Sequence, residues 1–218
     1  LTDDSLRRRE VALIAGRTDR EGLELLSPLH YLQQALAPTA DLLDGALDDV
    51  LPANPDVIVL ADVATMTDDE SAKLADWVEE GGLLLRFAGP HVAASDISRD
   101  AIDPLMPVRL RSGGRSVGGA MSWGEPKALA PFRDSSPFFG LNIPDDVRVS
   151  AQVMAQPGKR MGQGQVVLFH VTANAEWSTL PLSGLFVEML ERLAVSSAAS
   201  APEAADLQGT VWQPEQVM

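Results

Sequence analysis

The sequence predicts an α/β fold in which a mainly parallel sheet lies between two layers of helices. Short apolar runs typical of buried parallel strands alternate with segments of helical periodicity over residues 11–89, and the alternation returns near residue 165. The middle of the chain, from about residue 91 to residue 156, instead has short strand-like runs separated by glycines and prolines. We therefore expect a three-layer domain with a β-rich, antiparallel insertion.

Composition excludes several classes of function. The 218 residues are 45% hydrophobic and 22% charged, which is typical of a globular domain. Asp and Glu number 31 against 17 Lys and Arg, and the resulting net charge of −14 opposes binding to nucleic acid or to anionic lipid. The sequence has no cysteine, which excludes disulfides, cysteine-ligated metals and thiol nucleophiles. We predict no cofactor and no nucleic-acid partner.

The first strand and helix follow from local signals. Val11–Ala15 is an apolar run that ends at Gly16, as a buried strand does before a loop. Ser27 and Pro28 resemble a helix N-cap followed by proline at the first helical position. One face of the predicted helix would carry Leu29, Leu32 and Leu36.

A second strand, helix and strand follow in the same order. Val57–Leu60 is the next buried strand, and Thr67 with Glu70 forms the Ser/Thr-x-x-Glu pattern of a capping box. The helix that begins there directs three side chains inward, namely Leu74, Trp77 and Val78. It is predicted to stop at Gly81-Gly82, before a strand at Leu83–Phe87.

The remaining segments complete one domain over residues 10–195. Strand-like runs at 108–110 and 147–154 belong to the insertion, where Gly113-Gly114 and Gly118-Gly119 are predicted hairpin turns. A last strand is expected at Val166–His170 and a last helix at Pro181–Ala194. Residues 196–218 are small, polar and proline-containing, which predicts a flexible or extended linker.

The stretch PDVIVLADVATMTDDESAKLADWVEEGGLLLRFAGP resembles the strand, helix, Gly-Gly, strand core of the class I glutamine amidotransferase-like superfamily. That superfamily has a flavodoxin-like three-layer fold and includes non-catalytic members, such as the trimerisation domain of bacterial β-galactosidases. WVEEGGLLLRFAGP, MSWGEPKALAPF and VVLFHVTANAEWSTLPLSGLFVEML more narrowly resemble the central soluble region of large bacterial membrane proteins. Those proteins carry a BatA-like N-terminal double-transmembrane segment and a C-terminal DUF4159 domain.

The catalytic residues of the glutaminases in that superfamily are not matched here. Those enzymes use a cysteine on a strand-to-helix turn, a histidine after a late strand, and a glutamate two residues further on. The corresponding turn reads AGPHVAAS and lacks a nucleophile elbow, while Glu176 lies six residues after His170. Ser95 and Ser122 are not in elbow patterns either. The resemblance therefore implies a module without glutaminase activity.

Four polar residues are candidates for a ligand pocket: Asp62, His91, His170 and Asn174. Asp62 and His91 follow predicted strands and His170 ends one, and the carboxyl ends of such strands form the usual binding edge of a doubly wound sheet. His170 is a candidate base or ligand, and the alternative is a strand-terminal histidine that is hydrogen-bonded to the backbone. Three scattered histidines do not form a metal motif, so we predict no metal site.

Two groups of residues have structural alternatives to a functional role. Trp123, Trp177 and Trp212 are candidate anchors for a partner, although Trp177 is expected to be buried beneath the last helix. The acidic residues Asp41, Asp44, Asp48 and Asp49 are expected on a solvated face.

Three functions remain open at this stage. The first is a non-catalytic module for protein interaction or ligand binding in a membrane-anchored bacterial envelope protein. The second is a hydrolase or transferase with a site near His91 and His170, and the third is a structural spacer. The resemblance implies an anchor elsewhere in the parent chain and a periplasmic location, with partners among other proteins or flanking domains. The chain begins with Leu1, so we expect a piece of a longer protein, and we also expect a loop to be missing between Gly158 and Lys159.

Overall fold

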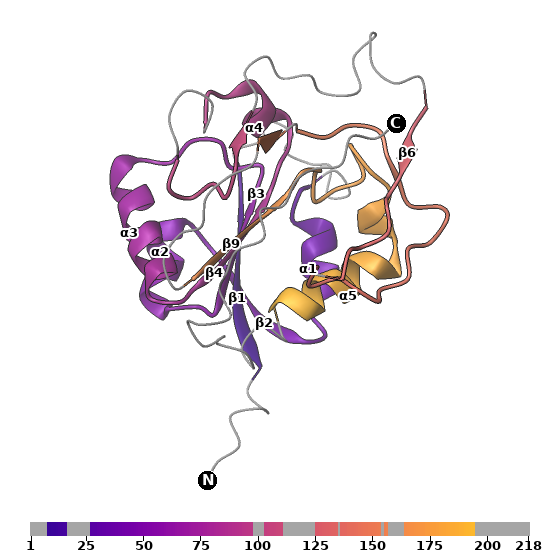
Figure 1. The fold of residues 1–218 in the computed structure, drawn as a ribbon. Coiled ribbons are helices and arrows are strands. Elements are labelled where there is room, and N and C mark those ends of the chain that lie inside the picture. Colours follow the sequence, from indigo (N-terminus) through magenta and orange to yellow (C-terminus); the bar gives the residue numbers. More distant parts are fainter. Residues whose placement is uncertain are drawn as a thin grey trace.

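The computed structural model describes residues 8–16, 27–97, 103–110, 125–134, 136–153, 155–156 and 164–194. A five-stranded, wholly parallel sheet in the order β2-β1-β3-β4-β9 forms its centre (Figure 1). The strands are β1 (Arg9–Ala15), β2 (Ala40–Asp44), β3 (Val57–Ala61), β4 (Leu83–Phe87) and β9 (Gln165–Phe169). The predicted α/β class is confirmed.

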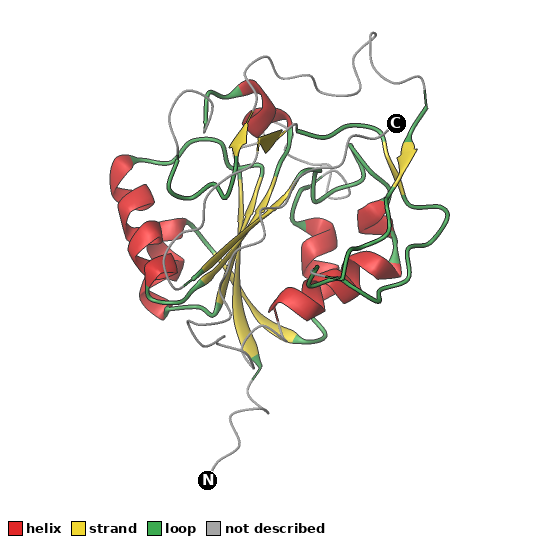
Figure 2. Cartoon of the chain, viewed as in Figure 1, coloured by secondary structure: helices red, strands yellow, loops and turns green. Residues whose placement is uncertain are grey.

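Helices cover both faces of the sheet, which explains why β3 is apolar throughout and β4 is apolar except for Arg86. α1 (His30–Leu36) and α5 (Gly184–Ala194) pack on one face, and α2 (Leu47–Val50) and α3 (Asp68–Glu79) pack on the other (Figure 2). Side chains alternate between the two cores along each strand, so that Val11 and Leu13 face α1 and α5 while Ala12 faces the opposite layer.

The predicted capping box begins α3. Glu70 N donates to Thr67 Oγ1 at 3.2 Å, and Thr67 N donates to Glu70 Oε2 at 2.7 Å. The helix ends before Gly81, whose φ of 114° suits glycine. Trp77 is buried as expected and donates its indole N–H to Pro55 O at 3.1 Å.

Two predicted helix starts are wrong. α1 begins at His30, because Ser27 forms a turn in which its Oγ accepts from Leu29 N and its carbonyl accepts from His30 N. The last helix does not run unbroken from Pro181. Leu180–Leu182 form a short 3-10 helix, η4, and the extended backbone of Ser183 separates it from α5. Leu182, at the end of η4, is 59% exposed.

The edge strand β2 and helix α2, with the short 3-10 helix η3 (Leu51–Ala53) after it, were not predicted. The four acidic residues in this region, Asp41, Asp44, Asp48 and Asp49, are exposed as expected. Lys73 of α3 lies 2.6 Å from Asp69 and 2.9 Å from Asp48. Hydrogen bonds to these two carboxylates raise the pKa of the Lys73 ammonium, and Asp69 makes the larger contribution.

The described part of the insertion is antiparallel, as predicted, but each strand described there is only two residues long. β5 (Arg109–Leu110) pairs with β8 (Ala155–Gln156), and β6 (Lys127–Ala128) pairs with β7 (Arg148–Val149). The short helix α4 (Pro90–Ala94) connects β4 to this region. The described helices include none that is long and apolar enough to cross a membrane.

Several predictions lie outside the described residues. They concern the Gly113-Gly114 and Gly118-Gly119 turns, Ser122, Trp123, Trp212, the expected gap after Gly158, and the linker at 196–218.

Candidate functional site

Asp62 lies directly after β3, at the carboxyl edge of the sheet, in a left-handed conformation with φ of 55°. Its backbone N–H donates to Phe87 O at 3.0 Å, which ties it to the end of β4. A Cβ atom on Gly16 would lie 2.3 Å from Asp62 O, so this close approach requires glycine after β1. A left-handed backbone is uncommon for a residue other than glycine and often marks a functional position.

The Asp62 carboxylate caps α4. Its Oδ1 accepts from Val92 N at 3.0 Å, and its Oδ2 accepts from His91 N at 3.1 Å. The same Oδ2 lies 2.7 Å from His91 Nδ1. Both oxygens therefore have fixed partners, and two of the backbone N–H groups that a helix leaves unpaired at its start are satisfied.

The side chains of Asp62 and His91 differ in their exposure to solvent. The side chain of Asp62 is 10% exposed, whereas that of His91 is 50% exposed. Because a carboxylate only accepts hydrogen bonds, we assign the single proton of the uncharged imidazole to Nδ1. Nε2 then carries the lone pair, on a ring that solvent can reach. This arrangement provides one oriented hydrogen-bond acceptor at the edge of the sheet.

His170 does not pair with Asp62 or His91 among the residues that the structure describes. It follows β9, and its carbonyl oxygen accepts from Val153 N at 2.9 Å. Burial lowers the pKa of its imidazole, and a hydrogen bond with the Val153 backbone partly opposes that effect. This matches the alternative of a backbone-bonded histidine at a strand end. A ligand shared by all four candidate residues stays a prediction.

Asn174 belongs to a turn that positions Trp177. Its Oδ1 accepts from Glu176 N at 3.2 Å, and its carbonyl accepts from Thr172 Oγ1 at 2.9 Å. Thr172 Oγ1 in turn accepts from Trp177 N at 3.2 Å. Trp177 is 6% exposed and packs in the same core as α5, so its predicted burial is confirmed.

A nucleophile is missing from the strand-to-helix turn after β4. Ala88, Gly89 and Pro90 occupy it, and none has a nucleophilic side chain. Ser95, at the far end of α4, donates its hydroxyl to Val92 O at 2.9 Å and accepts from Ile97 N. No group of three or more His, Cys, Asp or Glu side chains suited to a metal occurs in the described part of the chain.

Arg86 is a buried cation that sequence reasoning missed. It lies in β4 on the face toward α2 and α3 and is 2% exposed. Its guanidinium donates to Val63 O at 2.8 Å and to Leu105 O at 3.1 Å, which joins the loop after β3 to the segment around Leu105. Burial lowers the pKa of Arg86 to about 10, with Asp103 opposing, so it remains charged at neutral pH.

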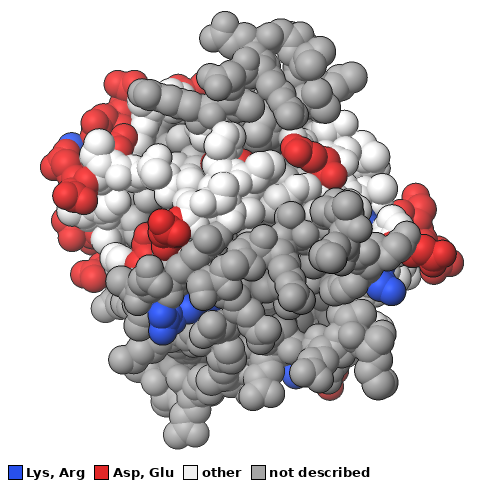
Figure 3. All heavy atoms as spheres, turned by 90° about the horizontal axis from the view of Figure 1, so that it is seen from above, with Lys and Arg blue, Asp and Glu red and all other residues white. Residues whose placement is uncertain are grey.

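The view from above shows how charge is distributed around this edge of the molecule. Asp and Glu gather on the side that carries α2 and α3, whereas Lys and Arg form only small patches among the described residues (Figure 3). This pattern agrees with the overall excess of acidic residues.

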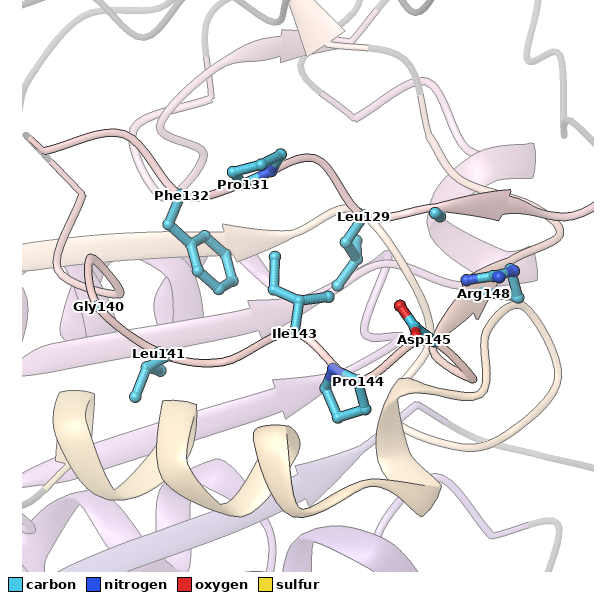
Figure 4. Close-up of a pocket in the computed structure, with 10 residues that line it drawn as sticks. Leu129, Pro131, Phe132, Gly140, Leu141, Ile143, Pro144, Asp145 and Arg148 are labelled. Carbon is cyan, nitrogen blue, oxygen red and sulfur yellow. The ribbon is translucent and has the colours of Figure 1, made fainter.

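The described part of the insertion contains a cavity with no link to the Asp62–His91 pair. A cavity of about 340 Å³ opens between the segments 128–132 and 140–148 (Figure 4). Apolar residues and a glycine line it together with one acidic and one basic residue: Ala128, Leu129, Pro131, Phe132, Gly140, Leu141, Ile143, Pro144, Asp145 and Arg148. This cavity could not be predicted from the sequence, because its two walls are separate segments without regular secondary structure.

The fold and this edge define a doubly wound α/β domain with an Asp–His pair beside its third and fourth strands. Neither a protein-family model nor a curated protein sequence matches the chain. It is similar in structure to cytoplasmic protein STM3548 from Salmonella typhimurium, with a TM-score of 0.55 and 13% identity over 84% of this chain and 96% of that one. At this identity the likeness shows the fold alone.

A weaker structural likeness is to the exo-β-1,4-mannosidase Op5Man5 from Opitutaceae bacterium strain TAV5. The TM-score is 0.49 and the identity 16%, over 95% of this chain and 37% of the mannosidase.

Proposed function

We propose that the chain is a non-catalytic, amidotransferase-like module that binds a protein or a small ligand within a membrane-anchored bacterial envelope protein. One observation supports it most directly. The carboxylate of Asp62 occupies the amino end of α4 and accepts hydrogen bonds from the His91 and Val92 N–H groups.

This contact argues against acyl transfer at the turn after β4. Enzymes with a nucleophile elbow stabilise the oxyanion with backbone N–H groups next to the nucleophile. In this chain two such N–H groups already donate to a carboxylate, whose negative charge would repel an oxyanion. The turn also lacks a serine or cysteine. The turn therefore lacks both a nucleophile and free N–H groups for an oxyanion, at the position where the superfamily's enzymes carry out the reaction.

The same contact suits binding. His91 presents Nε2 on a half-exposed ring, while the buried Asp62 carboxylate fixes the orientation of that ring. Such an acceptor recognises a donor group, such as an amide or a hydroxyl, on a ligand or a protein surface. The carboxyl edge of a doubly wound sheet is the usual location for such recognition.

A second candidate function is a hydrolase or transferase in which His91 acts as a general base. The 2.7 Å distance between Asp62 Oδ2 and His91 Nδ1 favours it, because a carboxylate that orients an imidazole is a common element of acid–base catalysis. The nucleophile would then be water or a substrate hydroxyl.

Incubating the chain with glutamine in an ammonia-coupled assay tests the proposal directly. We expect only background release of ammonia, at the same level in the unsubstituted chain and in the His91→Ala and His170→Ala variants. Turnover of glutamine by the unsubstituted chain, if it is lost in either variant, would overturn the non-catalytic proposal and identify the histidine involved. Ligand binding is tested by amide NMR shifts during a fragment screen, where shifts around Asp62 and His91 that disappear in His91→Ala support the proposed edge.

The membrane-anchored parent and a periplasmic location remain part of this proposal, and they rest on the sequence resemblance. Fusing alkaline phosphatase after Met218 in the full-length parent tests them. Phosphatase activity supports a periplasmic domain, and a signal only from a reporter that works in the cytoplasm overturns it.

A further inference from the structure

The inner wall of the insertion cavity runs along α5. Near the end of α5, Arg192 Nη1 donates to Phe139 O at 2.7 Å and to Pro137 O at 3.1 Å. Before the helix begins, Thr179 Oγ1 donates to Asp146 O at 2.8 Å. These contacts attach the segment 137–146 to the end of α5 and to the residue that precedes η4. The chain therefore leaves α5, at Ala194, close to the end of the cavity formed by Gly140 and Leu141.

An aromatic series anchors this wall to the sheet. The ring of Phe132, which lines the cavity, lies 5.5 Å from that of Phe138, and Phe138 lies 6.3 Å from Phe169 of β9. Phe169 stacks on Phe87 of β4 at 4.3 Å. Because the wall rests on the core, the cavity is largely formed before anything binds in it.

Several apolar side chains in and beside the cavity remain accessible to solvent. Phe139, adjacent to the lining residue Gly140, is 52% exposed, and Leu129, Phe132 and Ile143 are only partly buried. A cavity of about 340 Å³ lies near the lower limit of roughly 300–1,000 Å³ for ligand sites, which suits one or two side chains of a peptide.

The sequence after α5 contains a segment with matching chemistry. Residues 195–210 are mostly small or polar, and Val211-Trp212-Gln213-Pro214 then combines an aromatic, an aliphatic and a proline side chain. Tryptophan is among the residues that most often anchor an interface. Glu215 follows this segment in the sequence. Its charge is opposite to that of Arg148, which lines the other end of the cavity (Figure 4).

We propose that Val211–Pro214 of the same chain docks in the insertion cavity, with Trp212 against Phe132 and Ile143. Val211 follows Ala194 by about 17 residues, which reach roughly 55 Å when extended and average roughly 23 Å when flexible. α5 has 11 residues and spans about 16 Å, so the segment can cover the whole length of the cavity wall. Tethering gives an effective concentration on the order of millimolar, which is enough for a weak site.

Fluorine NMR of the 218-residue chain labelled with 5-fluorotryptophan tests this inference. Trp212→Phe assigns the Trp212 resonance, and a soluble gadolinium chelate measures its access to solvent. We compare the parent with Ile143→Glu, which places a charge in the cavity, and with the matched control Leu182→Glu, which charges an exposed leucine outside it. The resonances of the buried Trp77 and Trp177 report whether each variant is folded. Leu129→Ala provides a milder cavity variant if Ile143→Glu unfolds.

Docking predicts that Trp212 is protected in the parent and in Leu182→Glu, and several-fold more accessible in the cavity variant. A Trp212 that is already accessible in the parent overturns the inference, and so does protection that the cavity variants leave unchanged. Protection that appears only as protein concentration rises also overturns it, because the occupant is then a second copy of the chain. None of these outcomes depends on the Asp62–His91 pair.

Discussion

A Cβ atom placed on Gly89 would lie 2.4 Å from Cγ of Asp62. The backbone of Gly89 is extended, with φ and ψ both −170°, so any residue could adopt its conformation and only space demands glycine. The carboxylate cannot move aside cheaply, because it accepts hydrogen bonds from α4 through both oxygens. We expect Gly89→Ala to lower the free energy of unfolding by about 1–3 kcal/mol, measured by urea denaturation.

Gly184→Ala is the matched control for that substitution. A Cβ atom there meets nothing within 4 Å, and the position begins α5. The free energy of unfolding of Gly184→Ala should equal that of the unsubstituted chain or exceed it by up to about 1 kcal/mol. Equal losses in the two variants would contradict the proposed clash with Asp62.

The Asp62–His91 contact also fixes a tautomer. In its uncharged form the His91 ring should carry its proton on Nδ1, because Asp62 Oδ2 lies 2.7 Å away and the carboxylate can only accept. Long-range nitrogen–proton NMR distinguishes the two ring nitrogens. In Asp62→Asn the ring loses its fixed acceptor and should sample both tautomers. A parent spectrum with the proton on Nε2 would contradict the assignment.

Arg86 should be one of the costliest side chains to remove. Arg86→Met leaves Val63 O and Leu105 O buried without their donor, and we expect a loss of about 2–4 kcal/mol in the free energy of unfolding. Arg192→Met is a matched control, since Arg192 also donates to two carbonyls, but at an exposed site where water replaces it. That variant should lose at most about 1 kcal/mol. Similar losses would show that burial of Arg86 is not the cause.

Stability should decrease in mild acid because of His170. Burial lowers the pKa of its imidazole in the folded chain below the ordinary 6.5, so between the two pKa values the unfolded chain binds more protons. The free energy of unfolding then falls as pH drops below about 6.5, and this contribution is fully present above that pH. In His170→Gln the urea midpoint should depend less on pH between 5 and 7.5. An unchanged pH dependence would contradict the role of His170.

The parts of the fold that follow local rules were predictable. The capping box at Thr67 needs only residues within one helical turn, and the apolar strands β3 and β4 are recognisable by themselves. β2 was missed because an edge strand with the sequence ADLLD, exposed at Asp41 and Asp44, lacks a continuous apolar run. The start of α1 was misplaced because Ser27 caps a turn instead of the helix.

The site was only half predictable for a different reason. Asp62 and His91 were candidates from their places after strands, but their contact depends on the left-handed backbone of Asp62 and on the space left by Gly89. The structural role of Arg86 could not be predicted from its place in an apolar strand, because its hydrogen-bond acceptors are carbonyl groups of two distant loops. Such pairings arise from the assembled fold and have no signature in nearby sequence.

The position of β9 affects the order in which the domain is made. The connections between β1 and β4 are residues 16–39, 45–56 and 62–82, whereas the connection from β4 to its partner β9 is the much longer segment 88–164. During synthesis four strands leave the ribosome well before the fifth, and β4 waits with one edge open. Closing that long loop concentrates an entropic cost in one late step. The nascent chain is consequently most exposed to intermolecular strand pairing along β4.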